Sequence, residues 1–128
     1  MLQTWLELAR DARKAASRLV TEGHFRSCVS RAYYAAYSKV THELTATAGL
    51  TMPTDREGPG HGIGRGGVRR MIETSMLSMK PEKRVKLSEL IGRLYTLRID
   101  ADYKPSVEVE GADAREALSI MKTVFESF

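Results

Sequence analysis

The sequence has no long apolar stretch and only one cysteine, and each absence narrows the class of protein. No apolar run approaches the roughly 18 residues that a transmembrane helix requires, so we expect no membrane span. Glu7, Arg10 and Asp11 interrupt the first apolar pattern, which a secretory signal peptide would keep unbroken. Cys28 has no second cysteine with which to form an internal disulfide. We therefore expect a cytoplasmic protein.

Motifs for metals, cofactors and nucleophilic catalysis are also missing. His24 and His42 have no carboxylate or cysteine partners at metal-ligand spacing, so no metal site is predicted. No serine or cysteine lies in a nucleophile motif. The glycine-rich segment has no preceding strand and no Gly-Lys-Ser/Thr sequence, which excludes a P-loop and a dinucleotide fingerprint. We therefore expect no cofactor.

The apolar residues that are present recur at steps of three and four, which is typical of amphipathic helices. This pattern predicts helices near residues 2–19, 25–44, 65–79, 81–103 and 114–128. The 128 residues, 42% hydrophobic and 28% charged, suit one globular domain over residues 1–128. Because no strand pair is credible, we predict an all-α fold: an antiparallel up-and-down bundle of four to five helices.

Residues 51–67 interrupt this pattern with two prolines, six glycines and no apolar period, so we predict a surface loop. The loop contains His61 and leads into a predicted helix whose first turns include Arg65, Arg69 and Arg70. Backbone amides at a helix N-terminus, together with arginines, can hold an anion. A mobile loop is the interpretation that we favour over this one.

Charge is divided along the chain, although the net charge is only +4. Residues 56–86 carry eight basic side chains against three acidic ones, whereas residues 99–128 carry seven acidic against three basic. A basic middle beside an acidic tail can bind nucleic acid, or it can meet a complementary copy of itself. A solvated surface of mixed charge explains the pattern equally well.

Two polar clusters lie where apolar residues would be expected. In the second helix, residues 31–37 place three tyrosines among alanines, and Arg31 and Tyr34 share a face. We favour a close helix contact with hydroxyls at its edge over a direct catalytic role. In the fourth helix, Arg98 and Asp102 are four positions apart, and Tyr103 follows. This cluster predicts either a structural ion pair or a phosphate-binding arginine, and the residues alone do not decide between them.

Together these segments resemble the HEPN family of small helical-bundle proteins. The matching segments are residues 30–37, SRAYYAAY, and residues 98–103, RIDADY. The same branch of the family tends to have a histidine in the loop before the third helix, which would be His61. The resemblance covers almost the whole chain in helix order and spacing.

The resemblance implies a homodimer packed through its helices and often encoded beside a small nucleotidyltransferase. Many HEPN proteins are metal-independent ribonucleases whose site is an arginine followed, four to six residues later, by a histidine. Arg98 matches the arginine, but Tyr103 stands at the first allowed position and no histidine follows it. A phenol with a pKa of about 10 is a poor base at neutral pH, where an imidazole exchanges protons readily.

Three hypotheses follow. The leading one is a dimeric HEPN-type module that binds nucleic acid or a partner protein in a two-gene toxin–antitoxin or defence-like system. The second is a metal-independent endoribonuclease toxin that uses Arg98 with Tyr103 or His61. The third is a nucleotide-binding module built on the glycine loop. In addition to Arg98, Tyr103 and His61, the residues expected to take part in binding are Arg31, Tyr34, Arg65, Arg69, Arg70 and Asp102.

Overall fold

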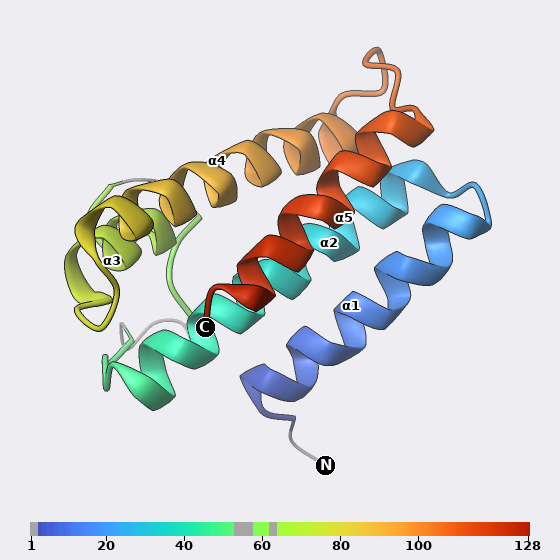
Figure 1. Cartoon of the computed structure of the whole chain (residues 1–128). Helices are drawn as coiled ribbons and strands as arrows, with labels where there is room; N and C mark the ends of the chain where they lie inside the picture. The colour runs from blue at the N-terminus through green and yellow to red at the C-terminus, as the bar shows by residue number, and fades with distance from the viewer. Residues whose placement is uncertain (1–2, 53–57, 62–63) are drawn as a thin grey trace.

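The chain folds as a helical bundle, as seen in a computed structural model that describes residues 3–52, 58–61 and 64–128 (Figure 1). Over these residues it has five α-helices: α1 (Trp5–Thr21), α2 (Phe25–His42), α3 (Val68–Ser75), α4 (Pro81–Tyr103) and α5 (Gly111–Glu126). A π-helical turn, η1 (Glu43–Thr47), continues α2. No strand forms within the described ranges, where Gly60 and Gly67 make one isolated bridge. The prediction of an all-α bundle is confirmed.

The helix ends follow from local chemistry. Thr4 caps α1 by accepting a hydrogen bond from the Glu7 amide at 3.1 Å. Pro81 opens α4, where its missing N–H removes no helical hydrogen bond. The start of α5 carries a capping box, in which Glu110 and Asp113 each accept from the other's backbone amide. These signals explain where α1, α4 and α5 begin.

The third helix is shorter than predicted, because it ends at Ser75 rather than at Met79. Lys80 precedes a proline and is extended, with φ −62° and ψ 148°, so the helix cannot run directly into α4. The chain reverses over residues 76–80 instead. Met76 and Met79 remain buried in the turn, which explains why their spacing resembled a helical stripe.

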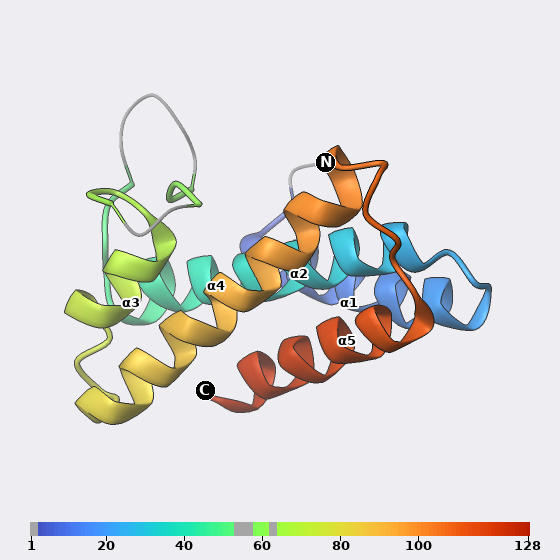
Figure 2. The same cartoon turned by 90° about the horizontal axis from the view of Figure 1, so that it is seen from above.

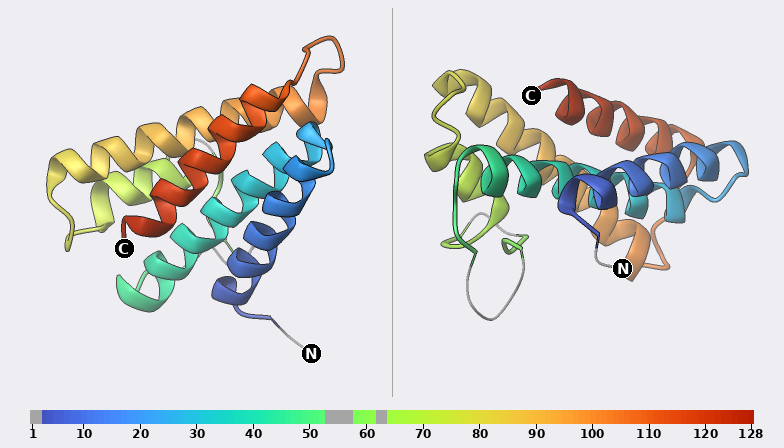
Figure 3. Two further views of the ribbon diagram at one scale, coloured as in Figure 1. Left: turned by 45° about the vertical axis from the view of Figure 1, so that its right-hand side comes forward. Right: turned by 90° about the horizontal axis from the view of Figure 1, so that it is seen from below.

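Helix α2 occupies the centre of the bundle and contacts α1, α4 and α5 (Figure 2). Both α1 and α2 bury several alanines, and small side chains let helix backbones approach closely. Helix α3 lies against α4 (Figure 3). The buried alanines of α1 and α2 are Ala9, Ala12, Ala16, Ala32, Ala35 and Ala36.

Among the described residues, no helix combines the length and the apolar character that crossing a bilayer requires. Parts of two predicted elements, residue 2 of the first helix and residues 53–57 and 62–63 of the glycine loop, lie outside the described residues.

Candidate functional site

The crossing of α2 and α4 brings Arg98 against Tyr34. Arg98 is only 8% exposed. Its Nη2 donates to the hydroxyl of Tyr34 at 2.7 Å and to the hydroxyl of Tyr103 at 3.3 Å, while its Nε donates to Oδ2 of Asp102 at 2.9 Å. The Arg98–Asp102 ion pair expected from the sequence therefore forms, and two tyrosines complete it.

The guanidinium of Arg98 keeps its charge in this setting. Burial lowers the pKa of Arg98, but interactions with Tyr34 and Tyr103 and the hydrogen bond to Asp102 outweigh burial and raise it. Ser30 adds a hydrogen bond to Oδ2 of Asp102 at 3.1 Å, which fixes the carboxylate. The cluster therefore holds a permanent cation in one orientation.

A second arginine shares the ring of Tyr34. The Cζ atoms of Arg31 and Arg98 each lie 5.1 Å from the centroid of this ring. Arg31 is exposed, and Tyr103, which is 63% exposed, also contacts Arg98. Two guanidinium groups at one tyrosine attract an anion, because each presents several N–H donors in a planar fork.

His61 joins the tyrosines of α2 rather than pointing into solvent. Its Nδ1 lies 2.6 Å from the hydroxyl of Tyr33, and its ring stacks on Tyr95 with centroids 6.0 Å apart. Tyr33 in turn lies beneath Arg98, whose Cζ is 5.7 Å from the ring centroid. Tyr33 thus connects the loop histidine to the arginine, and so does Tyr34, whose ring centroid lies 6.3 Å from that of His61.

Tyr33 stays a neutral phenol at this position. Burial, and then the neighbouring Tyr37, raise the pKa of Tyr33 well above its ordinary value. Its hydroxyl can donate to an unprotonated Nδ1 of His61 or accept from a protonated one. It therefore orients the imidazole and does not supply a base of its own.

The described part of the glycine loop that reaches α2 is buried, which corrects the prediction of a surface loop at these positions. Gly58 and Pro59 are buried, and the hydroxyl of Tyr37 donates to the Pro59 carbonyl at 2.6 Å. A buried phenol needs a hydrogen-bond partner, and this carbonyl provides one. A Cβ on Gly58 would lie 2.5 Å from that hydroxyl and 3.1 Å from the ring of Trp5. Only glycine lets the chain approach so closely.

The three arginines expected to hold an anion, Arg65, Arg69 and Arg70, do not form one cluster. Arg69 turns toward α4, where its Nε donates to Ser88 Oγ at 3.1 Å and where Gly92 leaves room for its guanidinium. Arg65 and Arg70 line a shallow pocket of about 360 Å³ beside Gly64 and Thr74. No hydrogen bond or ion pair within the described ranges joins the three to Arg98. Of the three arginines expected to bind a nucleotide, only Arg65 and Arg70 therefore lie on one surface.

Arg26 has a positioning role that sequence reasoning missed. Its guanidinium donates to the carbonyls of Asp100, Ala101 and Lys104 at the end of α4, and to those of Pro105 and Val107 beyond it. The last carbonyls of a helix have no partner within it, and a cation near them is favourable. Nothing in the helical pattern of residues 25–44 distinguishes Arg26 from a solvated arginine, because its partners are more than 70 positions away.

No group of three or more metal-ligating side chains gathers in the described part of the chain. No family model matches this chain, and no curated protein or solved structure shows significant similarity to it. The resemblance to HEPN proteins therefore stays a prediction that rests on residues 30–37 and 98–103.

Proposed function

We propose that this protein is a HEPN-type module that binds nucleic acid through its phosphate groups at Arg31, Tyr34 and Arg98. The observation that carries the proposal is the placement of two guanidinium groups on the ring of Tyr34. Arg98 is fixed by Asp102, and its Nη1 makes no hydrogen bond to a described residue and is not among the fully buried atoms without a partner. This donor and the exposed Arg31 are the groups that would hold a phosphate.

The residues near Arg98 favour binding of nucleic acid without its cleavage. Tyr103 occupies the position where the resemblance would place a catalytic histidine, and a phenol exchanges protons poorly at neutral pH. The Nδ1 of His61 is engaged with the hydroxyl of Tyr33. Arg98 can stabilise negative charge, and the carboxylate beside it, Asp102, is engaged by hydrogen bonds from Arg98 and Ser30.

The proposal is tested by fluorescence anisotropy with a labelled single-stranded RNA. Arg31→Ala should weaken binding about five- to tenfold, since one charge-assisted phosphate contact contributes on the order of 1 kcal/mol. Arg98→Lys should weaken it as well, because lysine lacks the planar fork. Arg115→Ala, which removes an exposed arginine from α5, is the matched control. Equal affinities for all four proteins would rule out this site.

We also propose a homodimer that works with a nucleotidyltransferase in a two-gene toxin–antitoxin or defence-like system. The resemblance and the divided charge of the sequence support this part. Two apolar side chains near the junction of α3 and α4, Leu77 at 77% and Val85 at 48% exposure, are consistent with a contact surface there. Light scattering at micromolar concentration should give twice the mass of the chain, and a monomer would contradict the proposal.

A second candidate function is a metal-independent endoribonuclease. It is favoured by the position of His61, which Tyr33 connects to Arg98, and by the hydrogen bond between Arg98 and Tyr103. RNA cleavage by the purified protein in EDTA, abolished by His61→Ala or Tyr103→Phe, would establish this function in place of binding alone. In cells, a ribonuclease should arrest growth when it is expressed, and Arg98→Ala should relieve this arrest.

A further inference from the structure

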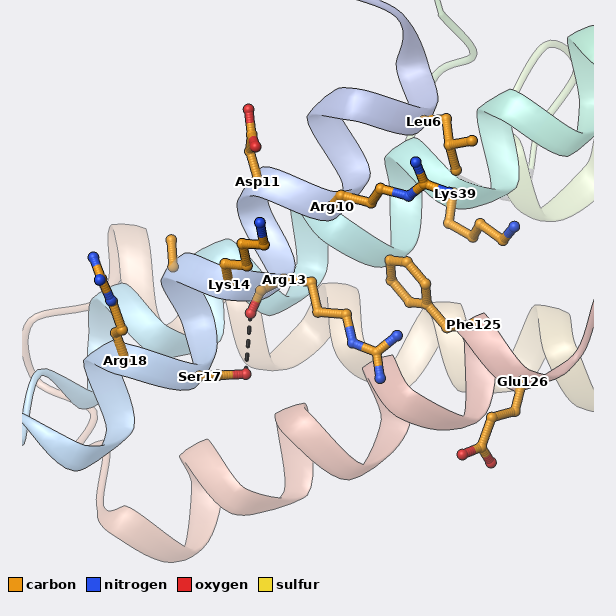
Figure 4. Close-up of a pocket in the computed structure, with 11 residues that line it drawn as sticks. Leu6, Arg10, Asp11, Arg13, Lys14, Ser17, Arg18, Lys39, Phe125 and Glu126 are labelled. Carbon is orange, nitrogen blue, oxygen red and sulfur yellow. Dashed lines mark hydrogen bonds between the residues drawn. The ribbon is translucent and has the colours of Figure 1, made fainter.

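A groove of about 1060 Å³ lies between α1 and α5, away from the residues of the Arg98 cluster (Figure 4). Helix α1 forms one wall, and Phe125 and Glu126 of α5 form the other, with Lys39 of α2 between them. The lining contains five basic residues against two acidic ones. The basic residues are Arg10, Arg13, Lys14, Arg18 and Lys39.

The cations along α1 have few partners inside the molecule. The side chains of Arg10, Lys14 and Arg18 are exposed and form no ion pair with any residue that the structure describes. By contrast, Arg93 of α4 and Lys104, the residue after α4, are each paired with a carboxylate. Like charges four positions apart on a helix repel one another and disfavour it by a few tenths of a kcal/mol per pair. An external anion would relieve this repulsion.

The spacing of these three cations suits a chain of repeated negative charges. Residues four apart on an α-helix are separated by about 6 Å along its axis, so Arg10, Lys14 and Arg18 form a row about 12 Å long. Arg13 lies beside the row, with its Cζ 4.7 Å from the centroid of Phe125 (Figure 4). Cations that follow a backbone beside an aromatic ring are typical of surfaces that bind single-stranded nucleic acid.

We infer that this groove binds the backbone of a single-stranded nucleic acid, with Arg10, Lys14 and Arg18 on successive phosphates and Phe125 as a platform for a base. The inference rests on the proposed nucleic-acid binding and adds a contact surface that shares no residue with the Arg98 cluster. Charge complementarity favours this occupant, because the acidic groups on the lining are few and Asp11 is already bonded to Gln3 at 2.9 Å.

The test measures binding of a fluorescein-labelled oligouridylate to the full chain by anisotropy over a range of salt concentrations. The triple variant Arg10→Gln, Lys14→Gln, Arg18→Gln keeps good helix formers on α1. Its affinity at low salt should fall by more than about tenfold, and the slope of log K against log salt should decrease by about 2, since each phosphate contact on a single strand contributes roughly 0.7. Phe125→Leu should weaken binding about fivefold or more.

The matched control removes three exposed lysines near the start of α4, in the variant Lys80→Gln, Lys83→Gln, Lys86→Gln. A loss in the control equal to that in the α1 variant, or an unchanged salt slope in the α1 variant, would overturn the inference. So would binding of polyglutamate as tight as that of oligouridylate, because the groove would then be a general site for acidic chains. Circular dichroism of each variant verifies that α1 remains folded.

Different protein variants test the Arg98 site and the groove, so the failure of one proposal can be told from the failure of the other. If Arg31→Ala weakens binding and the α1 triple variant does not, the groove inference is wrong and the Arg98 site stands. If only the α1 triple variant weakens binding, the groove stands and the Arg98 site is not where phosphate binds. If the unmodified protein binds no oligouridylate, the groove inference is overturned, and the Arg98 site is then judged by its own RNA probe.

Discussion

Arg98 and Tyr34, which are 64 positions apart in the sequence, are joined by a hydrogen bond of 2.7 Å from Nη2 to the phenolic oxygen. This bond connects α4 to α2 at the point where Asp102 and Tyr103 also meet the guanidinium. An arginine that is 8% exposed needs such partners, because an unpaired buried charge is costly. The cluster is thus a structural crosslink as well as the candidate phosphate site.

A double-mutant cycle measures this crosslink. Tyr34→Phe removes one acceptor from Arg98 and should reduce the free energy of unfolding by about 1.5–3 kcal/mol, the range for a hydrogen bond to a charged group. Arg98→Gln should reduce it further, and the two effects should couple by at least about 0.5 kcal/mol in urea unfolding. Strict additivity would show that the hydrogen bond contributes nothing of its own.

The bond between Tyr33 and His61 should hold the end of the glycine loop on α2. Tyr33→Phe keeps the buried ring but removes the hydroxyl, so we expect a loss of about 1 kcal/mol in unfolding free energy. Amide hydrogen exchange of residues 60 and 61 should become faster. Tyr95→Phe is the control, because the Tyr95 hydroxyl makes no hydrogen bond to a described residue while its ring stacks on His61. Equal effects of the two substitutions would argue against the role of the Tyr33 hydroxyl.

Gly58 should tolerate no side chain. In Gly58→Ala the new methyl would meet the Tyr37 hydroxyl at 2.5 Å and the Trp5 ring at 3.1 Å, so the loop must move away from α2. We expect a loss of about 1–3 kcal/mol, as for other overpacked sites, measured by thermal or urea unfolding. Gly64→Ala, whose Cβ would meet nothing within 4 Å, is the control and should change stability little.

The ion pair between Arg93 and Glu116 should give a measurable pH dependence. Two hydrogen bonds from Arg93, at 2.7 and 3.0 Å, lower the pKa of Glu116 below its ordinary value of 4.5. A carboxylate with a lowered folded pKa contributes stability that is complete above its unfolded pKa and is lost as the pH falls through the folded one. Because both side chains are about half exposed, the pair contributes less than about 1 kcal/mol.

NMR titration of the Glu116 carboxyl carbon tests this. The pKa should lie below 4.5 in the unmodified protein and should rise toward that value in Arg93→Gln. The same titration of Glu126, whose contact with Lys122 is long at 4.0 Å, serves as an internal comparison. A pKa for Glu116 that Arg93→Gln leaves unchanged would refute the assignment of its cause.

The helices and their order were determined by the sequence itself. Apolar residues at steps of three and four, Pro81 at a helix start and Pro105 after a helix end are local signals, because a helix satisfies its backbone hydrogen bonds within a few residues. The pairing of Arg98 with Asp102 was predictable for the same reason, since four positions on a helix place two side chains together. The end of α3 was misplaced by four residues, because buried methionines in a turn reproduced helical spacing, and α5 begins at Gly111, three residues before the predicted start.

What the tertiary structure alone decided are the contacts between elements. The approach of His61 to Tyr33, the withdrawal of Arg69 against α4 and the capping of α4 by Arg26 join residues up to 81 positions apart. No local pattern encodes such partners, because each depends on how two helices cross and on how much room a glycine leaves between them. The sequence by itself therefore determined which side chains share a helix face, and only the packing decided which faces meet.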